Sequence, residues 1–272
     1  MIRTDLAIEF LNFSKELSGV TKSEYQKGNV GITKIDITED QPLINKPKGK
    51  YITFSLENFK SAGFNIIEQS EIVAEELVSF LPQNNNGVLI VGLGNSDITP
   101  DALGPYSIGY IFATRHINGE LKKATGLEGI KSVCSIAPGV LGQTGIEVCE
   151  VVSSLVKSLK PDYIITIDAL AAQDASRLCS TIQVSDAGIS PGSGVQNARK
   201  ELSQKTLGIP VIAMGVPTVI DMSSVYSCNL GMMVTPKEID MCIEHASKTI
   251  AYAINKALQP ALSMEELISL VG

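Results

Sequence analysis

The sequence predicts an α/β fold, a three-layer α/β/α sandwich built on a mostly parallel, twisted sheet. Two stretches, 88–92 and 163–167, are apolar and uncharged, as strands buried on both faces of a parallel sheet are. Segments with helical spacing alternate with these and other short apolar stretches. Such alternation places helices on both faces of the sheet.

The length and composition of the chain suit one large α/β domain or two small ones. It has 272 residues, 44% of them hydrophobic, and a mean hydropathy of +0.18, so it can bury a sizeable core. It contains no internal repeat and no low-complexity linker. We therefore expect a single domain over residues 1–272 with a β-rich elaboration over residues 20–60.

Charge and side-chain chemistry exclude several classes of function. A formal net charge of −7 argues against nonspecific binding to nucleic acid or to anionic membranes. The five cysteines form no CxxC motif, which indicates reduced thiols in a cytoplasmic compartment. Two histidines are too few for a zinc site built on several of them. We find neither a signal peptide nor an apolar run long enough to cross a bilayer.

The first third of the chain combines an amphipathic helix with exposed strands. Helical spacing predicts a helix over residues 4–17, with Asp5, Glu9 and Glu16 facing solvent. Weak alternation then predicts strands, and a second apolar spacing predicts a longer helix. The strands are expected at 30–37 and 51–56, and the longer helix is expected at 66–81.

Regular alternation of strands and helices begins at Val88 and continues to the last residues. The predicted strands after the one at Val88 cover 132–136, 163–167, 181–184 and 211–214. The predicted helices cover 102–118, 145–159, 236–258, with Thr235 as its N-cap, and 263–271.

Two aspartates follow the two central strands. The strand at Val88 ends in Gly92-Leu93-Gly94-Asn95, after which Thr99 is a candidate N-cap, Pro100 begins a helix and Asp101 follows. Asp168 comes directly after the strand at 163–167. Ligands of open α/β sheets bind outside the carboxyl ends of the strands, so the two carboxylates are expected in one crevice.

Two neighbouring carboxylates push their pKa values apart, so that one can act as an acid and the other as a base when a water attacks an amide. The alternative is that Asp101 caps a helix and Asp168 accepts hydrogen bonds from loop amides. The residue pattern alone leaves both readings open.

Glycine-rich turns could hold a peptide or an oxyanion next to this pair. Such turns occur at 137–145, 185–194 and 215–218. The alternative is that they are tight turns that need a positive φ. A dinucleotide loop is disfavoured because Asp97 replaces its third glycine, and a serine triad is disfavoured because no histidine follows Ser193 closely. The candidate binding residues at the turns are Gly94, Asn95, Gly139, Gln143, Gly192 and Ser193.

The chain resembles the germination protease family of spore-forming bacteria in many blocks, in order, over nearly its whole length. These blocks are Arg3-Thr4-Asp5-Leu6-Ala7, Gly92-Leu93-Gly94-Asn95, Thr99-Pro100-Asp101-Ala102-Leu103-Gly104-Pro105, 137–145, Ile167-Asp168-Ala169-Leu170-Ala171-Ala172, 181–186, 191–195, 215–221 and 234–240. The resemblance implies a fold similar to that of hydrogenase-maturation proteases and a catalytic pair of aspartates, which fall on Asp101 and Asp168.

The resemblance also implies a substrate, an assembly and a processing step. Family members are endopeptidases that degrade small acid-soluble spore proteins in the spore core, and they are made as tetrameric zymogens that trim their own N-terminus. Their substrates are cut after the acid in a sequence like Thr-Glu-(Phe/Ile)-Ala-Ser-Glu-Phe. The sequence Thr4-Asp5-Leu6-Ala7-Ile8-Glu9-Phe10 is similar, which implies self-cleavage between Asp5 and Leu6 and a propeptide over residues 1–5.

The chain departs from the family pattern at a few positions. Ser190, Gln196 and Gln173 replace a common histidine, glycine and arginine, and the segment between Asp221 and Val234 is short. No histidine lies in a matching block, so we expect no metal and no cofactor. Two other functions stay open, a metal-dependent maturation-type protease of the same fold class and, because of these departures, a non-enzymatic regulatory paralogue. The first would lose its activity to chelators, and the second would be indifferent to Asp101→Asn.

Overall fold

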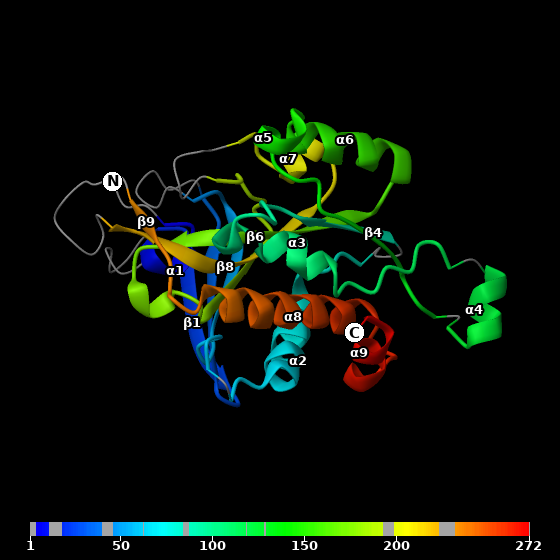
Figure 1. The fold of residues 1–272 in the computed structure, drawn as a ribbon, viewed down its shortest axis with the longest axis horizontal. Coiled ribbons are helices and arrows are strands. Elements are labelled where there is room, and N and C mark those ends of the chain that lie inside the picture. Colours follow the sequence, from blue (N-terminus) through cyan, green and yellow to red (C-terminus); the bar gives the residue numbers. More distant parts are fainter. Residues whose placement is uncertain are drawn as a thin grey trace.

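The structure is a computed structural model that describes residues 4–10, 18–39, 46–61, 63–83, 87–117, 119–127, 129–192, 199–222 and 232–271. One sheet runs through these residues in the strand order β1-β2-β3-β7-β8-β6-β4-β5, with β9 paired to β8 (Figure 1). The strands are β1 Val20–Lys27, β2 Val30–Ile37, β3 Gly49–Ser55, β4 Gly87–Gly92, β5 Ser132–Ile136, β6 Tyr163–Ala172, β7 Thr181–Ser185, β8 Val211–Asp221 and β9 Met233–Val234.

The two halves of the sheet differ in strand direction. The strands β8, β6, β4 and β5 run parallel to their neighbours in that order. The strands β1, β2, β3 and β7 join them through antiparallel pairs. The parallel half confirms the predicted fold class, and β1 to β3 form the β-rich elaboration expected over residues 20–60.

Helices cover both faces of the parallel half. One face carries α2, α3 and α8, and the other carries α5, α6 and α7, while α4 projects away from the body of the molecule (Figure 1). The helices are α1 Ala7–Phe10, α2 Ile66–Leu77, α3 Leu103–Ile108, α4 Gly119–Thr125, α5 Leu141–Thr144, α6 Val148–Leu159, α7 Gln204–Leu207, α8 Ile239–Leu258 and α9 Met264–Val271.

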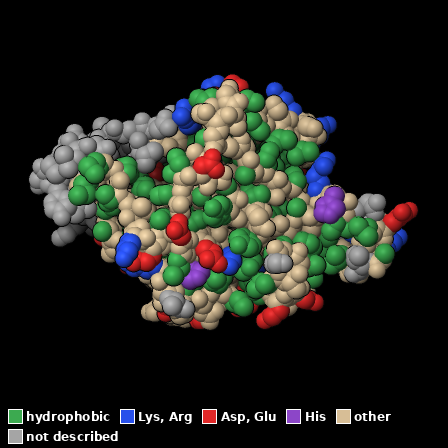
Figure 2. All heavy atoms as spheres, in the orientation of Figure 1, with side chains coloured by type: hydrophobic (Ala, Val, Ile, Leu, Met, Phe, Trp, Pro, Cys, Tyr) green, Lys and Arg blue, Asp and Glu red, His purple; other side chains and the backbone are tan. Residues whose placement is uncertain are grey.

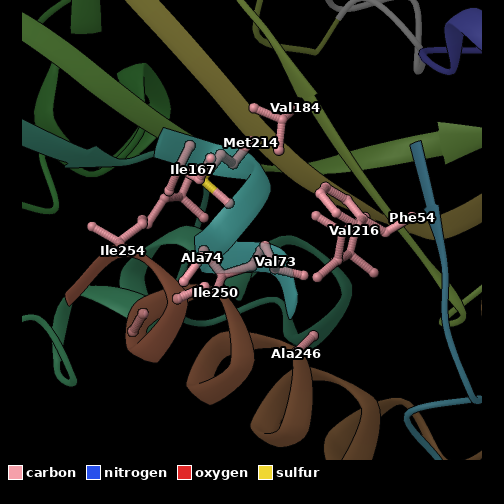
Figure 3. Close-up of a cluster of buried hydrophobic side chains, with 14 of the residues drawn as sticks. Phe54, Val73, Ala74, Ile167, Val184, Met214, Val216, Ala246, Ile250 and Ile254 are labelled. Carbon is pink, nitrogen blue, oxygen red and sulfur yellow. The ribbon is translucent and has the colours of Figure 1, made fainter. Parts of the chain in front are cut away.

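The larger core lies between the sheet and the helices α2 and α8. Figure 3 shows Val73 and Ala74 of α2 and Ile250 of α8 pointing toward strand residues such as Ile167. All four side chains are buried. Since burial of an aliphatic side chain stabilises the fold by about 1.5–3 kcal/mol, this layer fixes the sheet whose strand β6 carries Asp168.

Several predicted elements have different lengths in the structure. The helix predicted over 102–118 ends at Ile108, because the Asn255 amide takes the backbone groups that would continue it. Its Oδ1 accepts from the N–H of Phe112 at 2.9 Å and its Nδ2 donates to the carbonyl of Tyr110 at 2.8 Å. Helix α8 begins at Ile239 rather than 236, and Thr235 donates to the carbonyl of Thr218 instead of capping the helix.

The surface in view in Figure 2 mixes acidic, basic and hydrophobic side chains, with no single charge type extending over that face of the described chain. Within the ranges that the structure describes, no helix combines the length and the apolar character needed to cross a membrane.

Candidate active site

Glycines let strand β4 and helix α3 approach each other closely. Gly94 has a φ of +114°, and a Cβ there would collide with the carbonyl oxygen of Asp101. A Cβ on Gly104 would collide with the backbone of Leu93 and lie 2.6 Å from the carbonyl oxygen of Ile167. This contact holds the segment that carries Asp101 against the carboxyl ends of β4 and β6.

Asp101 is fixed by the turn that follows β4. The backbone N–H of Asn95 donates to its Oδ2 at 2.9 Å and to its carbonyl oxygen at 3.1 Å. The side chain of Gln143, on α5, donates to Asn95 Oδ1 at 2.8 Å and to Asp97 Oδ2 at 2.9 Å. Asn95 and Gln143, both predicted to bind substrate, therefore shape the loop that positions Asp101.

The chain before Asp101 differs from the predicted helix start. Residues Thr99–Asp101 form a short 3-10 turn whose N-cap is Ile98, and no side chain caps it. Thr99 is therefore not the N-cap, although Pro100 does lie in the first turn. Asp101 does not cap a helix either, because its carboxylate accepts from the loop amide of Asn95.

Asp168 lies inside β6 rather than after it, because this strand continues to Ala172. Its side chain is 5% exposed. On one side of β6, Asp168 is level with Gly215 of β8, and on the other side β4 has already ended opposite Ile167. Asp168 thus occupies the step at which β6 loses one neighbour, which is the carboxyl edge that the sequence predicted.

Burial shifts the titration of both carboxyls, and neighbouring negative charge shifts that of Asp168. Burial raises the pKa of Asp168 well above its usual value, and the negative charges of Asp101 and Asp5 raise it further. Burial also raises the pKa of Asp101, an effect that the Asn95 N–H opposes. Asp168, whose pKa is raised well above its usual value, is thus the stronger candidate to hold a proton, and the role of the two side chains as a catalytic pair stays a prediction.

The N-terminal segment 4–10 lies on the open edge of β6 next to this pair. The N–H of Asp5 donates to the carbonyl of Ala171 at 2.9 Å, and the N–H of Ala171 donates to Asp5 Oδ2 at 2.9 Å. Leu6 is fully buried and packs with Leu170 and Ala172. Since side chains alternate along a strand, Leu170 and Ala172 share the face of β6 that carries Asp168.

Two side chains donate to the carbonyl oxygen of Asp5. Lys46 Nζ lies 2.8 Å from it, and Gln183 Nε2 lies 2.9 Å from it. Gln183 Oε1 also accepts from the N–H of Ala7 at 2.6 Å, so one amide group holds both sides of the Asp5–Leu6 bond. Sequence reasoning missed both residues, since no local motif marks Lys46 and nothing in the block 181–186 singles out Gln183.

Glu9 does not face solvent as predicted, and it is only 3% exposed. Its carboxylate accepts from the N–H groups of Gln173 and Asp174, both at 2.9 Å, and its Oε1 lies 3.8 Å from Arg177 Nε. Two backbone donors and a cation replace the water that the amphipathic pattern led us to expect. The described helix in this segment, α1, is also shorter than predicted, and Glu16 lies outside the described residues.

The remaining candidates are only partly placed. Gly139 and Gly192 have φ values of +74° and +72°, as the tight-turn reading requires, and their part in binding a peptide stays a prediction. Ser193 and Gln196 lie outside the described residues. In the described part of the chain, no three His, Cys, Asp or Glu side chains gather as a metal site would need.

The buried carboxyl of Asp168 should make stability depend on pH. Because its pKa is higher in the folded chain than in the unfolded chain, the folded state binds more protons above about pH 4. Its contribution to the free energy of unfolding is therefore complete at low pH and decreases as pH rises through the folded pKa. We expect Asp168→Asn to gain stability relative to the unchanged chain between pH 4 and pH 8.

Urea unfolding at several pH values measures this difference. Asp36→Asn, on strand β2 in the antiparallel half of the sheet, is the control and should leave the difference between low and high pH unchanged. A stability gap between Asp168→Asn and the unchanged chain that stays constant over this range would contradict the assignment.

The family model and the curated relatives agree with each other. A family model described as germination protease matches residues 5–231. The germination protease of Clostridium acetobutylicum is 39% identical over 98% of both chains, and that of Bacillus velezensis is 42% identical over 84% of this chain and 65% of its own. A solved NiFe hydrogenase maturation protease, HycI from Thermococcus kodakarensis, aligns with 66% of this chain and 98% of its own at 15% identity and a TM-score of 0.36.

Proposed function

The chain belongs to the germination protease family, and from that premise we propose that it is an endopeptidase that cuts small acid-soluble spore proteins during germination, with Asp101 and Asp168 as its catalytic pair. The observation that carries the proposal is the raised pKa of the buried Asp168, on which the charge of Asp101 acts, beside a peptide segment on the adjacent strand edge. We further propose that it acts in the spore core, as a homotetramer that needs neither metal nor cofactor.

The two carboxyls would divide the work of hydrolysis. Ionised Asp101 takes a proton from a water while the oxygen of that water bonds to the carbonyl carbon of the scissile peptide. Protonated Asp168 gives its proton to the leaving nitrogen as the C–N bond breaks. One proton enters the pair and one leaves it, so transfer of the bound proton from Asp101 to Asp168 restores the starting state.

The same chemistry would trim the chain itself. Residues 4–10 resemble the family's substrate sequence, and Asp5 occupies the position of the acid after which substrates are cut. Its negative charge is among those that raise the pKa of Asp168, which supports a position close to the catalytic pair. We propose that the bond between Asp5 and Leu6 is the processing site.

Cleavage of a peptide that contains Thr-Glu-Phe-Ala-Ser-Glu-Phe tests the proposal. We expect cleavage after the first Glu, at a rate that a chelator does not change, and N-terminal mass analysis should show chains that begin at Leu6. Cleavage that a chelator abolishes would replace the two-aspartate mechanism by metal-dependent hydrolysis. A chain that cuts neither the peptide nor its own N-terminus would instead be a regulatory paralogue.

A further inference from the structure

The contacts of residues 4–10 show how a substrate could be recognised, if the proposed function holds. The residues of this segment that match the substrate sequence are also the ones that the fold holds. Leu6, Ala7 and Phe10 are at most 8% exposed, and Asp5 and Glu9 both use their carboxylates as acceptors. A surface tail that packed only through its apolar side chains would not need all of these polar contacts.

Asp168 and Gln183 project from one face of the sheet, on either side of Gly215. Gly215 lies level with Asp168 of β6 on one side and with Gln183 of β7 on the other, so the three residues form one row across the sheet. Neighbours in such a row project from the same face, about 5 Å apart. The space that a side chain on Gly215 would fill is taken by Leu170, whose Cγ lies 2.7 Å from an ideal Cβ there, and Leu6 of the bound segment packs with Leu170.

Gln183 and Lys46 contact the backbone at the Asp5–Leu6 bond, the bond that is proposed to be cut. Both donate to the carbonyl oxygen of Asp5, at 2.9 Å and 2.8 Å. When water adds to a carbonyl carbon, the negative charge develops on this oxygen, and two donors aimed at it stabilise the charge. Gln183 Oε1 accepts from the N–H of Ala7, and this hydrogen bond fixes the peptide on the other side of the Asp5–Leu6 bond.

A separate pocket, formed by Gln173, Asp174 and Arg177, holds Glu9, the acid four residues after Asp5. The Glu9 carboxylate accepts hydrogen bonds from the backbone N–H groups of Gln173 and Asp174, and the positive charge of Arg177 lies beside it. The Nε of Arg177 is buried without a hydrogen-bond partner and lies 3.8 Å from Glu9 Oε1, so its positive charge is available to an acidic side chain at this position.

We propose that Gln183 and Lys46 bind the carbonyl of the bond that is cut, and that Gln173, Asp174 and Arg177 bind the acidic side chain four residues beyond it, in protein substrates as in the chain's own segment.

The pocket for the second acid is tested by a specificity ratio. Two peptides are compared, Thr-Glu-Phe-Ala-Ser-Glu-Phe and the same sequence with Gln in place of its second Glu. The full chain should cut the Glu peptide with a kcat/KM about 10-fold to 100-fold higher, since a buried, charge-assisted contact is lost with Gln. Arg177→Met should reduce this ratio to about 3 or less, while Arg115→Met, on the exposed surface, should leave it unchanged.

A ratio measured within one enzyme sample does not depend on the fraction of active molecules, so partial self-processing of a variant does not affect it. The role of Gln183 is tested in the same way, with a peptide whose Ala is N-methylated and cannot donate to Gln183 Oε1. The unchanged chain should prefer the normal peptide by about 10-fold, and Gln183→Ala should reduce this preference to about twofold.

The outcomes separate this inference from the function on which it rests. If the unchanged chain cuts both peptides and Arg177→Met and Gln183→Ala keep its ratios, the assigned binding residues are wrong and the proposed function stands. If the unchanged chain cuts no peptide, the proposed function fails and this inference with it. Thermal unfolding of each variant establishes that a changed ratio comes from a folded protein.

Discussion

Asp168→Asn and Asp101→Asn should each lower kcat for the spore-protein peptide by about 10²- to 10⁴-fold, with little change in KM. An amide cannot take a proton from water at the position of Asp101, and it cannot give one to the leaving nitrogen at the position of Asp168. Because the two groups act as a unit, the double variant should be only slightly slower than either single one.

The matched control for this series is Asp97→Asn. Asp97 lies on the same loop as Asp101, but its carboxylate only accepts a hydrogen bond from Gln143, which the oxygen of an asparagine can also accept. We expect its kcat to stay within threefold of the unchanged chain. If Asp101→Asn kept more than a tenth of the original kcat, a role of Asp101 in proton transfer would be wrong.

Gly104→Ala should destabilise the fold by about 3 kcal/mol. The added methyl group would meet the backbone of Leu93 and the carbonyl oxygen of Ile167, and backbone atoms cannot move aside as the end of a flexible side chain can. Helix α3 would have to shift away from β4 and β6, so the position of Asp101 and the rate of peptide cleavage should change as well.

Urea unfolding of Gly104→Ala against Gly142→Ala measures this effect. Gly142 lies in α5, and a Cβ there would meet no atom within 4 Å. Its replacement should change the free energy of unfolding by less than about 1 kcal/mol. Equal stability of the two variants would show that the close approach of α3 to the strand ends is not needed.

The strands and the acid pair could be predicted because their signals are local. An uncharged apolar run such as 88–91 predicts a buried strand by itself, and an acid that follows such a run marks the edge where parallel strands end. The two aspartates could thus be singled out without any knowledge of how the strands are ordered, and the germination-protease blocks then pointed to the same pair.

Residues that act across long sequence separations could not be found in this way. Gln183 contacts the backbone at Asp5, 178 positions away, and Glu9 is buried only because Gln173 and Asp174 supply its donors. The end of α3 depends on Asn255, 143 positions from Phe112. None of these contacts leaves a periodic or compositional mark, so amphipathic spacing alone predicts a solvated Glu9 and a helix that is too long.

Because residues 4–10 bind to the edge of β6, they compete there with a separate substrate. A covalently attached segment reaches its binding site at an effective concentration of the order of millimolar, whatever the concentration of the protein. Its contacts at Ala171 and Arg177 therefore resist dilution, while those of a separate substrate do not. The affinity measured for a substrate then reports the intrinsic affinity multiplied by the fraction of chains whose own segment has left the edge.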